Sequence, residues 1–441
     1  MVTLPIQERA ADMSWLMYLY RAIVPPLSAA LPLASPFSPK LKAALAGRRG
    51  LANRLVTAAR HLQGCIWIHA TSVGEYEQAR PVINGLKDRY GDATPPIAVT
   101  HFSPSGYEYA LKRPCADFHD YLPWDRLAHM RNLVRLWNPR LLIFIKFDFW
   151  PNQILAAHDA GVPLLLLAGS LQPRSFRLRA VAKPFWRNLF DRFTHLGVCT
   201  EEDQRRFRKD LKDHCPITVT GDTRAEQVIL RFEASAGGPV ATRLLALGGS
   251  RLILGSTWPP DEQLWLPILP DLLNRFHDLF CFLAPHEPRP ERLTSLERQL
   301  AHRKIGVIRL SDFLNTAMQT SREIRCILVD SVGILAEIYR AGTLAYVGGS
   351  FTTGVHNTME PAVASQPVLF GPVIQNAEEA GVLVQRGAGF VVETPPQALA
   401  LASELLADSH RLTTLGQIAR QVVMSQKGAT EKSLALLEPY L

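Results

Sequence analysis

Short, almost purely apolar runs alternate with longer amphipathic runs along this chain from about residue 60 onward. Such apolar runs are typical of strands buried on both faces, and their alternation with helical spans is typical of a parallel sheet covered by helices. The expected strands are 66–70, 97–100, 141–145, 163–167, 196–199 and 217–219 in a first series, and 252–255, 280–283, 306–310, 326–329, 344–347, 367–370 and 390–392 in a second. The sequence therefore predicts an α/β architecture.

The two series together hold too many strands for one mononucleotide-binding fold. Between them lies a stretch of small residues, Ala-Ser-Ala-Gly-Gly-Pro at 234–239, with the composition of a domain boundary. We therefore expect two doubly wound domains with a cleft between them. Because ligands of such sheets bind beyond the carboxyl ends of the strands, we expect the functional residues in the loops that follow the strands.

The number and spacing of the cysteines indicate the redox state of the compartment in which the protein works. The six cysteines are scattered over the 441 residues, and none of them forms a Cys-x-x-Cys pair. This pattern argues for a reducing compartment and against a disulfide scaffold or a zinc site. The hydrophobic share of 47% is normal for a globular protein and too high for a disordered one.

Positive charge is concentrated at the amino terminus. Residues 1–60 hold eight Lys or Arg against two acidic residues, which accounts for +6 of the formal net charge of +8. The same region has an apolar, aromatic-bearing segment, 13–33, but Arg21 and three prolines interrupt the run that a transmembrane helix needs. We expect this segment to lie in an anionic membrane face. The alternative is a hydrophobic helix packed on the domain beside a solvated basic loop.

A second basic run has six Lys or Arg between residues 174 and 192, with aromatic residues interleaved. Nucleic acid, anionic lipid and a phosphorylated acceptor would all suit such a run. No recognised nucleic-acid module surrounds it, so we expect no nucleic acid as a partner.

Three loops that follow strands of the first series carry polar side chains. Glu75 follows the first strand at a predicted helix start, where it can act as a general base or simply complement the helix dipole. Ser103 and Ser105 follow the second strand and can bind a sugar or phosphate, or form an ordinary turn. Lys146 and Asp148 follow the third, as ligand-binding groups or as a structural ion pair.

The fifth strand of the second series leads into a glycine-containing loop. Gly348 and Gly349 let backbone N–H groups approach a phosphate, although the spacing matches neither the Walker A motif nor the dinucleotide fingerprint. Asn357 and Glu360 further along also fit a capping box, which is a wholly structural role. A histidine at 356 with Glu360 lacks a third ligand, so we expect no metal.

Taken together, the motifs resemble the Kdo transferases of lipopolysaccharide assembly, from about residue 13 to the carboxyl terminus. The motifs are Ser-Val-Gly-Glu (72–75), Ser-Pro-Ser-Gly (103–106), Tyr-Leu-Pro-Trp-Asp (121–125), Phe-Trp-Pro-Asn (149–152), Gly-Asp-Thr-Arg (221–224), Gly-Ser-Thr (255–257), Ala-Pro-His-Glu (284–287), Asp-Ser-Val-Gly (330–333), and Gly-Gly-Ser with His-Asn-Thr-Met-Glu-Pro-Ala between 348 and 362.

The resemblance implies a GT-B fold of two Rossmann-like domains with an interdomain cleft, and an inverting transfer without metal or cofactor. The segments it implies are a membrane-associating start at 1–45, an acceptor domain at 46–233, a nucleotide-sugar donor domain at 240–422, and a final helix at 423–441 that crosses back to the first domain.

The resemblance also assigns roles to residues. Glu75 matches the general base, and Asp148 matches a second acid that is normally Glu. On the donor side we expect Gly255, Ser256, Thr257, His286, Gly333, Gly348, Gly349, Asn357 and Glu360. For the acceptor we expect Ser103, Ser105, Lys146, Arg174 and Arg177.

The activity implied is transfer of Kdo from CMP-Kdo to a lipid A precursor, lipid IVA, in core assembly. We expect it at the cytoplasmic face of the cell inner membrane, with the donor, the acceptor and membrane lipid as partners. Two alternatives are another GT-B enzyme, such as a nucleotide-sugar epimerase or a different glycosyltransferase, and a catalytically silent membrane-bound homologue.

Overall fold

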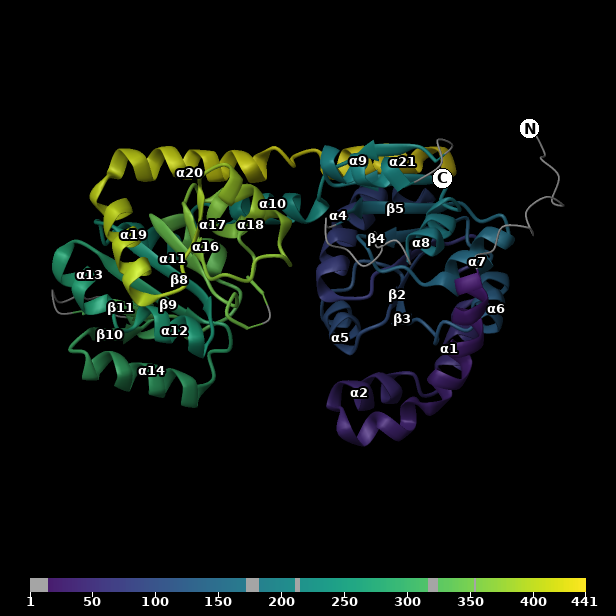
Figure 1. The fold of residues 1–441 in the computed structure, drawn as a ribbon, viewed down its shortest axis with the longest axis horizontal. Coiled ribbons are helices and arrows are strands. Elements are labelled where there is room, and N and C mark those ends of the chain that lie inside the picture. Colours follow the sequence, from purple (N-terminus) through teal and green to yellow (C-terminus); the bar gives the residue numbers. More distant parts are fainter. Residues whose placement is uncertain (1–14, 172–181, 211–214, 316–323, 353) are drawn as a thin grey trace. The chain divides into compact units, whose positions relative to one another are not determined.

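The computed structural model describes residues 15–171, 182–210, 215–315, 324–352 and 354–441. The chain forms two compact units, which are described one at a time (Figure 1). The N-terminal unit comprises the chain up to Gln227 together with Gly428–Leu441, and the C-terminal unit comprises Val228–Lys427. The cleft expected between the two domains stays a prediction.

Seven parallel strands form the sheet of the N-terminal unit, in the order β3-β2-β1-β4-β5-β6-β7. The strands are β1 (Ile66–His69), β2 (Ile97–His101), β3 (Phe118–Tyr121), β4 (Leu141–Ile145), β5 (Leu164–Gly169), β6 (His195–Val198) and β7 (Ile217–Val219). Successive side chains point to opposite faces, so Ile66 and Ile68 enter one core and Trp67 enters the other. This explains why the strands read as uninterrupted apolar runs.

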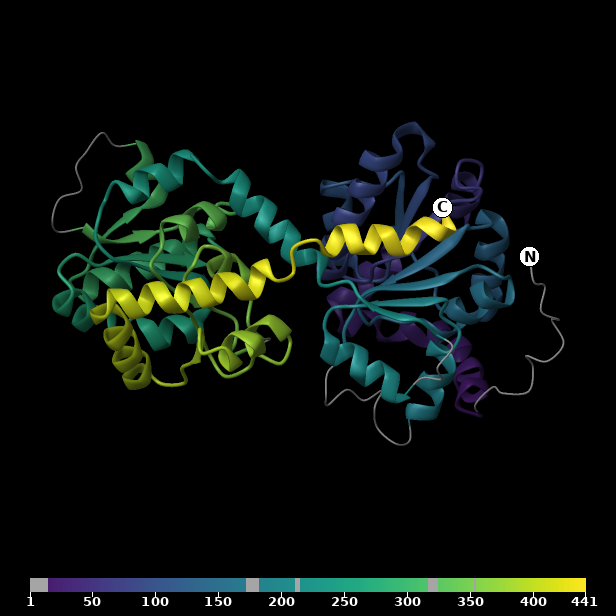
Figure 2. The ribbon, with the colours of Figure 1, turned by 90° about the horizontal axis from the view of Figure 1, so that it is seen from above.

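Helices cover both faces of this sheet. They are α1 (Trp15–Ala34), α2 (Pro39–Gly47), α3 (Leu51–Ala58), α4 (Val73–Tyr90), α5 (Pro104–Lys112), α6 (Leu127–Trp137), α7 (Pro151–Asp159), α8 (Lys183–Phe190), α9 (Glu201–Asp210), α10 (Thr223–Ala234), which leads into the C-terminal unit, and the last helix α21 (Ala429–Leu437). Figure 2 shows α21 lying on the N-terminal unit, where Leu434 and Leu437 join the core formed by β1 and α4.

The C-terminal unit repeats the architecture with strand order β10-β11-β9-β8-β12-β13-β14, again all parallel. Its strands are β8 (Arg251–Thr257), β9 (Phe280–Pro285), β10 (Gly306–Arg309), β11 (Ile324–Leu328), β12 (Leu344–Val347), β13 (Val368–Phe370) and β14 (Gly389–Val391). Its helices are α11 (Pro239–Leu245), α12 (Pro259–Trp265), α13 (Leu269–Arg275), α14 (Pro290–His302), α15 (Leu310–Asn315), α16 (Leu335–Ala341), α17 (Met359–Val363), α18 (Glu378–Gln385), α19 (Pro395–Ala407) and α20 (Ser409–Met424).

Both sheets reverse their strand order beside their first strand. In the N-terminal unit the reversal lies between β1 and β4, and in the C-terminal unit between β8 and β12. Loops that leave neighbouring strands in opposite directions open a crevice at such a switch point, which is where doubly wound sheets bind ligands. The predicted functional residues can be compared with these two places.

Helix α1 corrects one expectation about the amino-terminal segment. The three prolines at 25, 26 and 32 do not interrupt it, and the helix is continuous from Trp15 to Ala34. Ser28 and Arg126 both donate hydrogen bonds to the carbonyl of Pro25, which holds this part of the helix in place. The segment Trp15–Phe37 is long and apolar enough to cross a membrane, by length and composition only.

Candidate active site

The loops after β2, β1 and β4 carry the residues predicted in the N-terminal unit. Glu75 follows β1, Ser103 and Ser105 follow β2, and Lys146 and Asp148 follow β4. Because these three parallel strands are neighbours in the sheet, their carboxyl ends lie along one edge. The structure thus brings all five residues to one edge of the sheet, with Glu75, Lys146 and Asp148 at the switch point between β1 and β4.

Glu75 is buried at the start of α4, with a residual exposure of 4%. Its Oε2 accepts the backbone N–H groups of Thr71 at 2.6 Å and Ser72 at 3.2 Å, which closes a capping box with Ser72. Burial raises the pKa of Glu75 to about 8, and the negative charge of Asp148 adds to the rise. The two backbone donors and the positive charge of Lys146 oppose the rise in pKa. The structural role and a chemical role therefore coincide in one side chain.

Lys146 has a left-handed backbone, with φ of 65° directly after β4. A residue other than glycine held there is strained, and such strain is concentrated at functional sites. Asp148 lies two residues after this turn, and its negative charge raises the pKa of both Glu75 and Tyr20.

Asp125 lies buried beside this cluster and connects it to α1. Its carboxylate accepts the Tyr20 hydroxyl at 2.8 Å and the backbone N–H groups of Asn152 and Gln153 at 2.9 and 3.0 Å. Burial raises the pKa of Asp125 to about 6. The sequence motif contained Asp125, but its role as the anchor of Tyr20 was not predicted, because the two residues are 105 positions apart.

Several polar atoms around Asp125 are buried without a hydrogen-bond partner among the residues that the structure describes. They are Trp150 Nε1, Asn152 Oδ1, and both side-chain polar atoms of Gln153. Buried polar groups are normally paired, so a cluster of unpaired ones is a feature of a site that receives a ligand or water.

Ser103 and Ser105 serve the turn that was the alternative to ligand binding. Ser103 caps α5 by accepting the backbone N–H of Gly106 at 3.1 Å. The hydroxyl oxygens of Ser103 and Ser105 are 3.3 Å apart. Contact with an acceptor stays a prediction for both. Arg174 and Arg177 lie outside the described residues.

The donor residues predicted in the C-terminal unit follow four neighbouring strands. Gly255, Ser256 and Thr257 end β8, His286 follows β9, Gly333 follows β11, and Gly348 and Gly349 follow β12. These strands are adjacent in the order β11-β9-β8-β12, so their loops share one edge of the sheet. Ser256 also has a left-handed backbone, with φ of 54°.

The glycines allow close packing between these loops. A Cβ on Gly348 would lie 2.4 Å from the carbonyl oxygen of Ser256, and one on Gly255 would overlap the hydroxyl of Tyr339. The N–H of Gly348 donates to the carbonyl of Gly255 at 2.9 Å, and the N–H of Gly349 donates to Asp261 at 3.0 Å. These N–H groups are engaged within the unit, so their contact with a phosphate stays a prediction.

Asp261 holds this part of the site together and was not predicted as a site residue. It is fully buried and accepts the Tyr346 hydroxyl at 2.6 Å, besides the N–H groups of Gly349 and Trp258. It thereby ties the start of α12 to the loop after β12. Its position three residues after Trp258, at a helix start, is the one signal that sequence offered.

Three stacked rings lie at the same edge. The rings of His286 and His356 have centroids 4.3 Å apart, and Trp258 stacks on His286 at 4.9 Å. The indole N–H of Trp258 donates to Nε2 of His356 at 2.9 Å, which places the proton of the neutral imidazole on Nδ1. Burial lowers the pKa of His356 to about 4, so this imidazole is uncharged at neutral pH, and burial also lowers the pKa of His286.

Asn357 and Glu360 form the start of α17. The Asn357 Oδ1 accepts the N–H of Met359 at 3.1 Å, and its amide donates to Glu360 at 3.2 Å. The N-cap of α17 is Thr358, so Asn357 lies one residue before the N-cap position that the expected capping box requires. Arg231 approaches the Glu360 carboxylate at 3.8 Å.

Two parallel, doubly wound units, each with polar loops at its switch point, define the class: the chain has the GT-B fold. Its fold is similar to that of UDP-GlcNAc 2-epimerase from Neisseria meningitidis, with a TM-score of 0.61, at 11% identity and with coverage of 84% of this chain and 99% of that one. At that identity the likeness shows the fold alone, and it confirms the predicted GT-B architecture.

Sequence comparison gives the family. The model of the 3-deoxy-D-manno-octulosonic-acid transferase (kdotransferase) family matches residues 44–227. The 3-deoxy-D-manno-octulosonic acid transferase of Chlamydophila psittaci is 31% identical over 329 residues, which cover 73% of each chain. The enzyme of that name from Rickettsia felis is 28% identical over 371 residues, or 82% of this chain and 76% of its own. The chain belongs to the 3-deoxy-D-manno-octulosonic acid transferase family and is a glycosyltransferase, as its motifs predicted.

Proposed function

We propose that this enzyme transfers Kdo from CMP-Kdo to a hydroxyl of a lipid A precursor, lipid IVA, with inversion at the anomeric carbon. The observation that carries the proposal is the buried carboxylate of Glu75 at the switch point between β1 and β4, with Lys146 and Asp148 beside it. Membership of the family supplies the class of donor sugar.

In the proposed step Glu75 acts as the base. The acceptor oxygen attacks the anomeric carbon, the bond from that carbon to the phosphate oxygen of CMP breaks, and CMP leaves with the electron pair. The hydroxyl proton passes to Glu75, which must be ionised beforehand. The N–H groups of Thr71 and Ser72 hold its Oε2, so the carboxylate is oriented before the acceptor binds.

The C-terminal unit supplies the donor side of the proposal. The loops after β8, β9 and β12 are fixed by Asp261 and by the stack of Trp258, His286 and His356. Ring faces of this kind stack on a nucleobase, and backbone donors near helix starts favour phosphate. We infer that the CMP part of the donor binds along this edge.

The membrane is the second part of the proposal. Helix α1 exposes a set of large apolar side chains, and basic residues follow it in sequence; the exposed side chains are Trp15, Tyr18, Leu19, Ile23, Leu27 and Leu33. An apolar face beside positive charge binds an anionic membrane surface. We infer that the enzyme works at the cytoplasmic face of the inner membrane, where an amphiphilic acceptor is available.

The test is incubation of the purified full chain with CMP-Kdo and a tetra-acylated lipid A precursor, followed by mass analysis of the lipid. We expect the acceptor to gain Kdo with CMP-Kdo and to gain nothing from UDP-GlcNAc. Thermal unfolding in the presence of CMP or UDP reports the donor preference independently, because a ligand that binds the native state raises its stability. Protection by UDP alone, without lipid product, would contradict the proposal.

A further inference from the structure

A largely apolar pocket of about 620 Å³ lies in the N-terminal unit where α1 and α2 face the loops after β1, β2 and β4. One wall comes from the two helices, with Val24, Leu27 and Leu31 on α1 and Leu41 and Ala44 on α2. Its volume is within the range of sites that bind small molecules. Of the described residues predicted from the sequence to bind substrate or act in catalysis, Ser103 alone is among those that line this pocket.

The opposite wall is aromatic and rigid. Phe102, Trp124 and Trp150 form it, and Phe102 packs against Trp150 in a tilted arrangement with ring centroids 4.2 Å apart. The Arg48 guanidinium lies over the rings of Phe102 and Trp124 at 4.8 and 4.4 Å, and donates to the carbonyls of Leu122 and Phe102 at 3.0 and 3.1 Å. A wall fixed in this way does not collapse into the pocket, which keeps the cavity ready for a ligand.

Polar residues of the strand loops line the pocket beside the candidate base, namely Thr71, Ser103 and Asp125. The two helices and the turn between them add Tyr20, Ser28, Ser38 and Lys40 to an otherwise apolar lining. The N–H of Thr71 donates to Glu75 Oε2 at 2.6 Å, so the loop that borders the pocket also holds the carboxylate. The indole N–H of Trp150, for which the described residues provide no hydrogen-bond partner, belongs to the aromatic wall of the same pocket.

The other side of the pocket continues onto the exposed apolar face of α1. Leu27 lines the pocket and is nevertheless 59% exposed, so the pocket opens on that face. Lys40, which is exposed, also lines the pocket and provides a positive charge at its border. A molecule that suits these features has a long apolar chain attached to a polar, anionic head.

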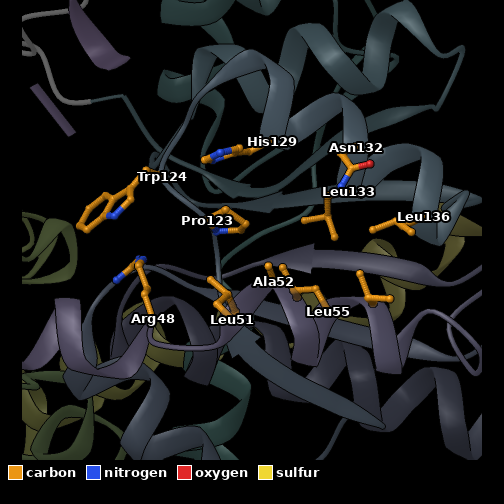
Figure 3. A pocket seen from close by; sticks show the side chains of 11 residues that line it. Arg48, Leu51, Ala52, Leu55, Pro123, Trp124, His129, Asn132, Leu133 and Leu136 are labelled. Carbon is orange, nitrogen blue, oxygen red and sulfur yellow. The ribbon is translucent and has the colours of Figure 1, made fainter. Parts of the chain in front are cut away.

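A second pocket in the same unit lacks the contact with the loop that holds Glu75. It has a volume of about 250 Å³ and lies between α3 and α6, lined by Leu51, Leu55 and Leu133 among others (Figure 3). Arg48 and Trp124 also border it, but neither Thr71 nor Ser103 does. Of the described residues, none in the loop that holds Glu75 lines it, so a chain bound there would not place a head group at the candidate base.

We propose that the pocket between α1 and α2 binds one fatty acyl chain of the lipid acceptor and so places the head-group hydroxyl at Thr71 and Glu75. The proposal rests on the function proposed above and adds a specificity-determining subsite to it. No bond changes in this pocket; it supplies position alone, since holding an amphiphile by its chain lowers the entropic cost of orienting its head. The acyl chain accounts for the apolar lining, and the polar, anionic head group accounts for Lys40 at the border and for the polar residues next to Glu75.

The test compares two variants of neighbouring residues on α1. Val24→Phe fills the pocket, whereas Ile23→Phe adds the same ring at a position that is 48% exposed and does not line it. Quenching of tryptophan fluorescence by a brominated stearate measures binding to the full chain directly. We expect Val24→Phe to weaken binding about tenfold or more, the effect of displacing roughly two methylene groups, and Ile23→Phe to leave it within about twofold. Equal binding by the two variants would overturn the proposal.

Transfer activity then identifies whose chain is bound. For Val24→Phe we expect kcat/KM to fall about tenfold with the acylated acceptor and to stay unchanged with the fully deacylated acceptor. An equal fall with both acceptors, or a loss of vesicle binding with transfer intact in mixed micelles, would overturn the acyl assignment. If Val24→Phe does not fold, Leu31→Phe takes its place. The absence of transfer by the unmodified enzyme to either acceptor would instead refute the proposed function itself.

Discussion

Glu75 has two roles: its carboxylate completes the capping box at the start of α4, and it is the candidate general base. A capping carboxylate is ordinarily exposed and ionised, but this one is buried, and burial raises its pKa to about 8. The helix start and Lys146 keep the ionised form accessible. The environment therefore places the titration of Glu75 near the working pH, which is the condition for efficient general base catalysis.

The first prediction at this scale is a pH profile. Because the base must be ionised, we expect kcat/KM to fall about tenfold for each unit of pH below about 8 and to level off above it. The measurement is the initial rate of lipid product formation at low substrate concentration between about pH 6 and about pH 9. A rate independent of pH over this range would show that no group with such a pKa acts as the base.

The second prediction concerns stability. The pKa of Glu75 is raised in the folded state above its ordinary value of 4.5, so folding favours the protonated form. That stabilisation is complete below about pH 4.5 and is lost as the pH rises to about 8. Glu75→Gln stays neutral throughout. We expect this variant to match the unmodified enzyme near pH 4.5 and to be more stable at pH 8, by more than about 1 kcal/mol, as chemical denaturation will show.

Glu108→Gln provides the control, because Glu108 is exposed on α5. Its free energy of unfolding should stay within about 0.5 kcal/mol of the unmodified enzyme at both pH values. If Glu75→Gln is destabilised at pH 8, burial does not dominate the pKa of Glu75, and the pH profile loses its basis.

At the scale of elements, the sequence predicted thirteen of the fourteen strands found in the described part of the chain, because a strand buried on both faces leaves an uninterrupted apolar run. Strand β3 (Phe118–Tyr121) was missed. It lies at the sheet edge, and its polar residues His119 and Asp120 break the apolar pattern, while Arg54 pairs with Asp120 at 2.7 Å. The pattern alone cannot show such tertiary compensation.

In the candidate site, too, the local sequence pattern predicted some features, whereas others depend on tertiary contacts. The order of the strands places residues such as Glu75 and Gly348 at switch points, and their position after apolar strands was sufficient to predict this. The roles of Asp261 and of the pair Tyr20 and Asp125 depend on contacts between segments far apart in sequence. Local pattern carries no signal for such contacts.

The prediction at this scale uses two glycines. In Gly348→Ala the new Cβ would meet the carbonyl oxygen of Ser256, a backbone atom that has little room to move, so we expect a loss of about 1–3 kcal/mol in unfolding free energy and a higher KM for CMP-Kdo. In Gly381→Ala, within α18, nothing lies within 4 Å, so we expect a gain of about 0.5–1 kcal/mol. Denaturant unfolding measures the two changes in unfolding free energy, and initial rates at varied CMP-Kdo concentration measure the KM. Equal effects would contradict the packing role assigned to Gly348.

At the scale of the whole molecule, the end of the chain completes the unit that its beginning forms. Helix α21 belongs to the N-terminal unit, where Leu434 lies against Gly85 of α4 and Glu226 accepts the N–H of Thr430 at 2.8 Å. The N-terminal unit therefore cannot complete its core until the C-terminal unit and α21 have been synthesised.

Leu434→Ala tests this arrangement. Truncation of a buried leucine should lower the unfolding free energy of the N-terminal unit by about 2–5 kcal/mol. In hydrogen exchange we expect faster exchange in β1 and α4 and no change in β8 and β9. Faster exchange confined to the C-terminal unit would contradict the assignment of α21.

The central claim is that Glu75 is the base in a Kdo transfer. Its most direct test is the mass of the acceptor lipid after reaction with CMP-Kdo in the presence of unmodified enzyme or of Glu75→Gln, at equal CMP binding. We expect the Kdo-bearing product from the unmodified enzyme and a rate at least about 100-fold lower from the variant. Product formed by Glu75→Gln at the unmodified rate would contradict the claim.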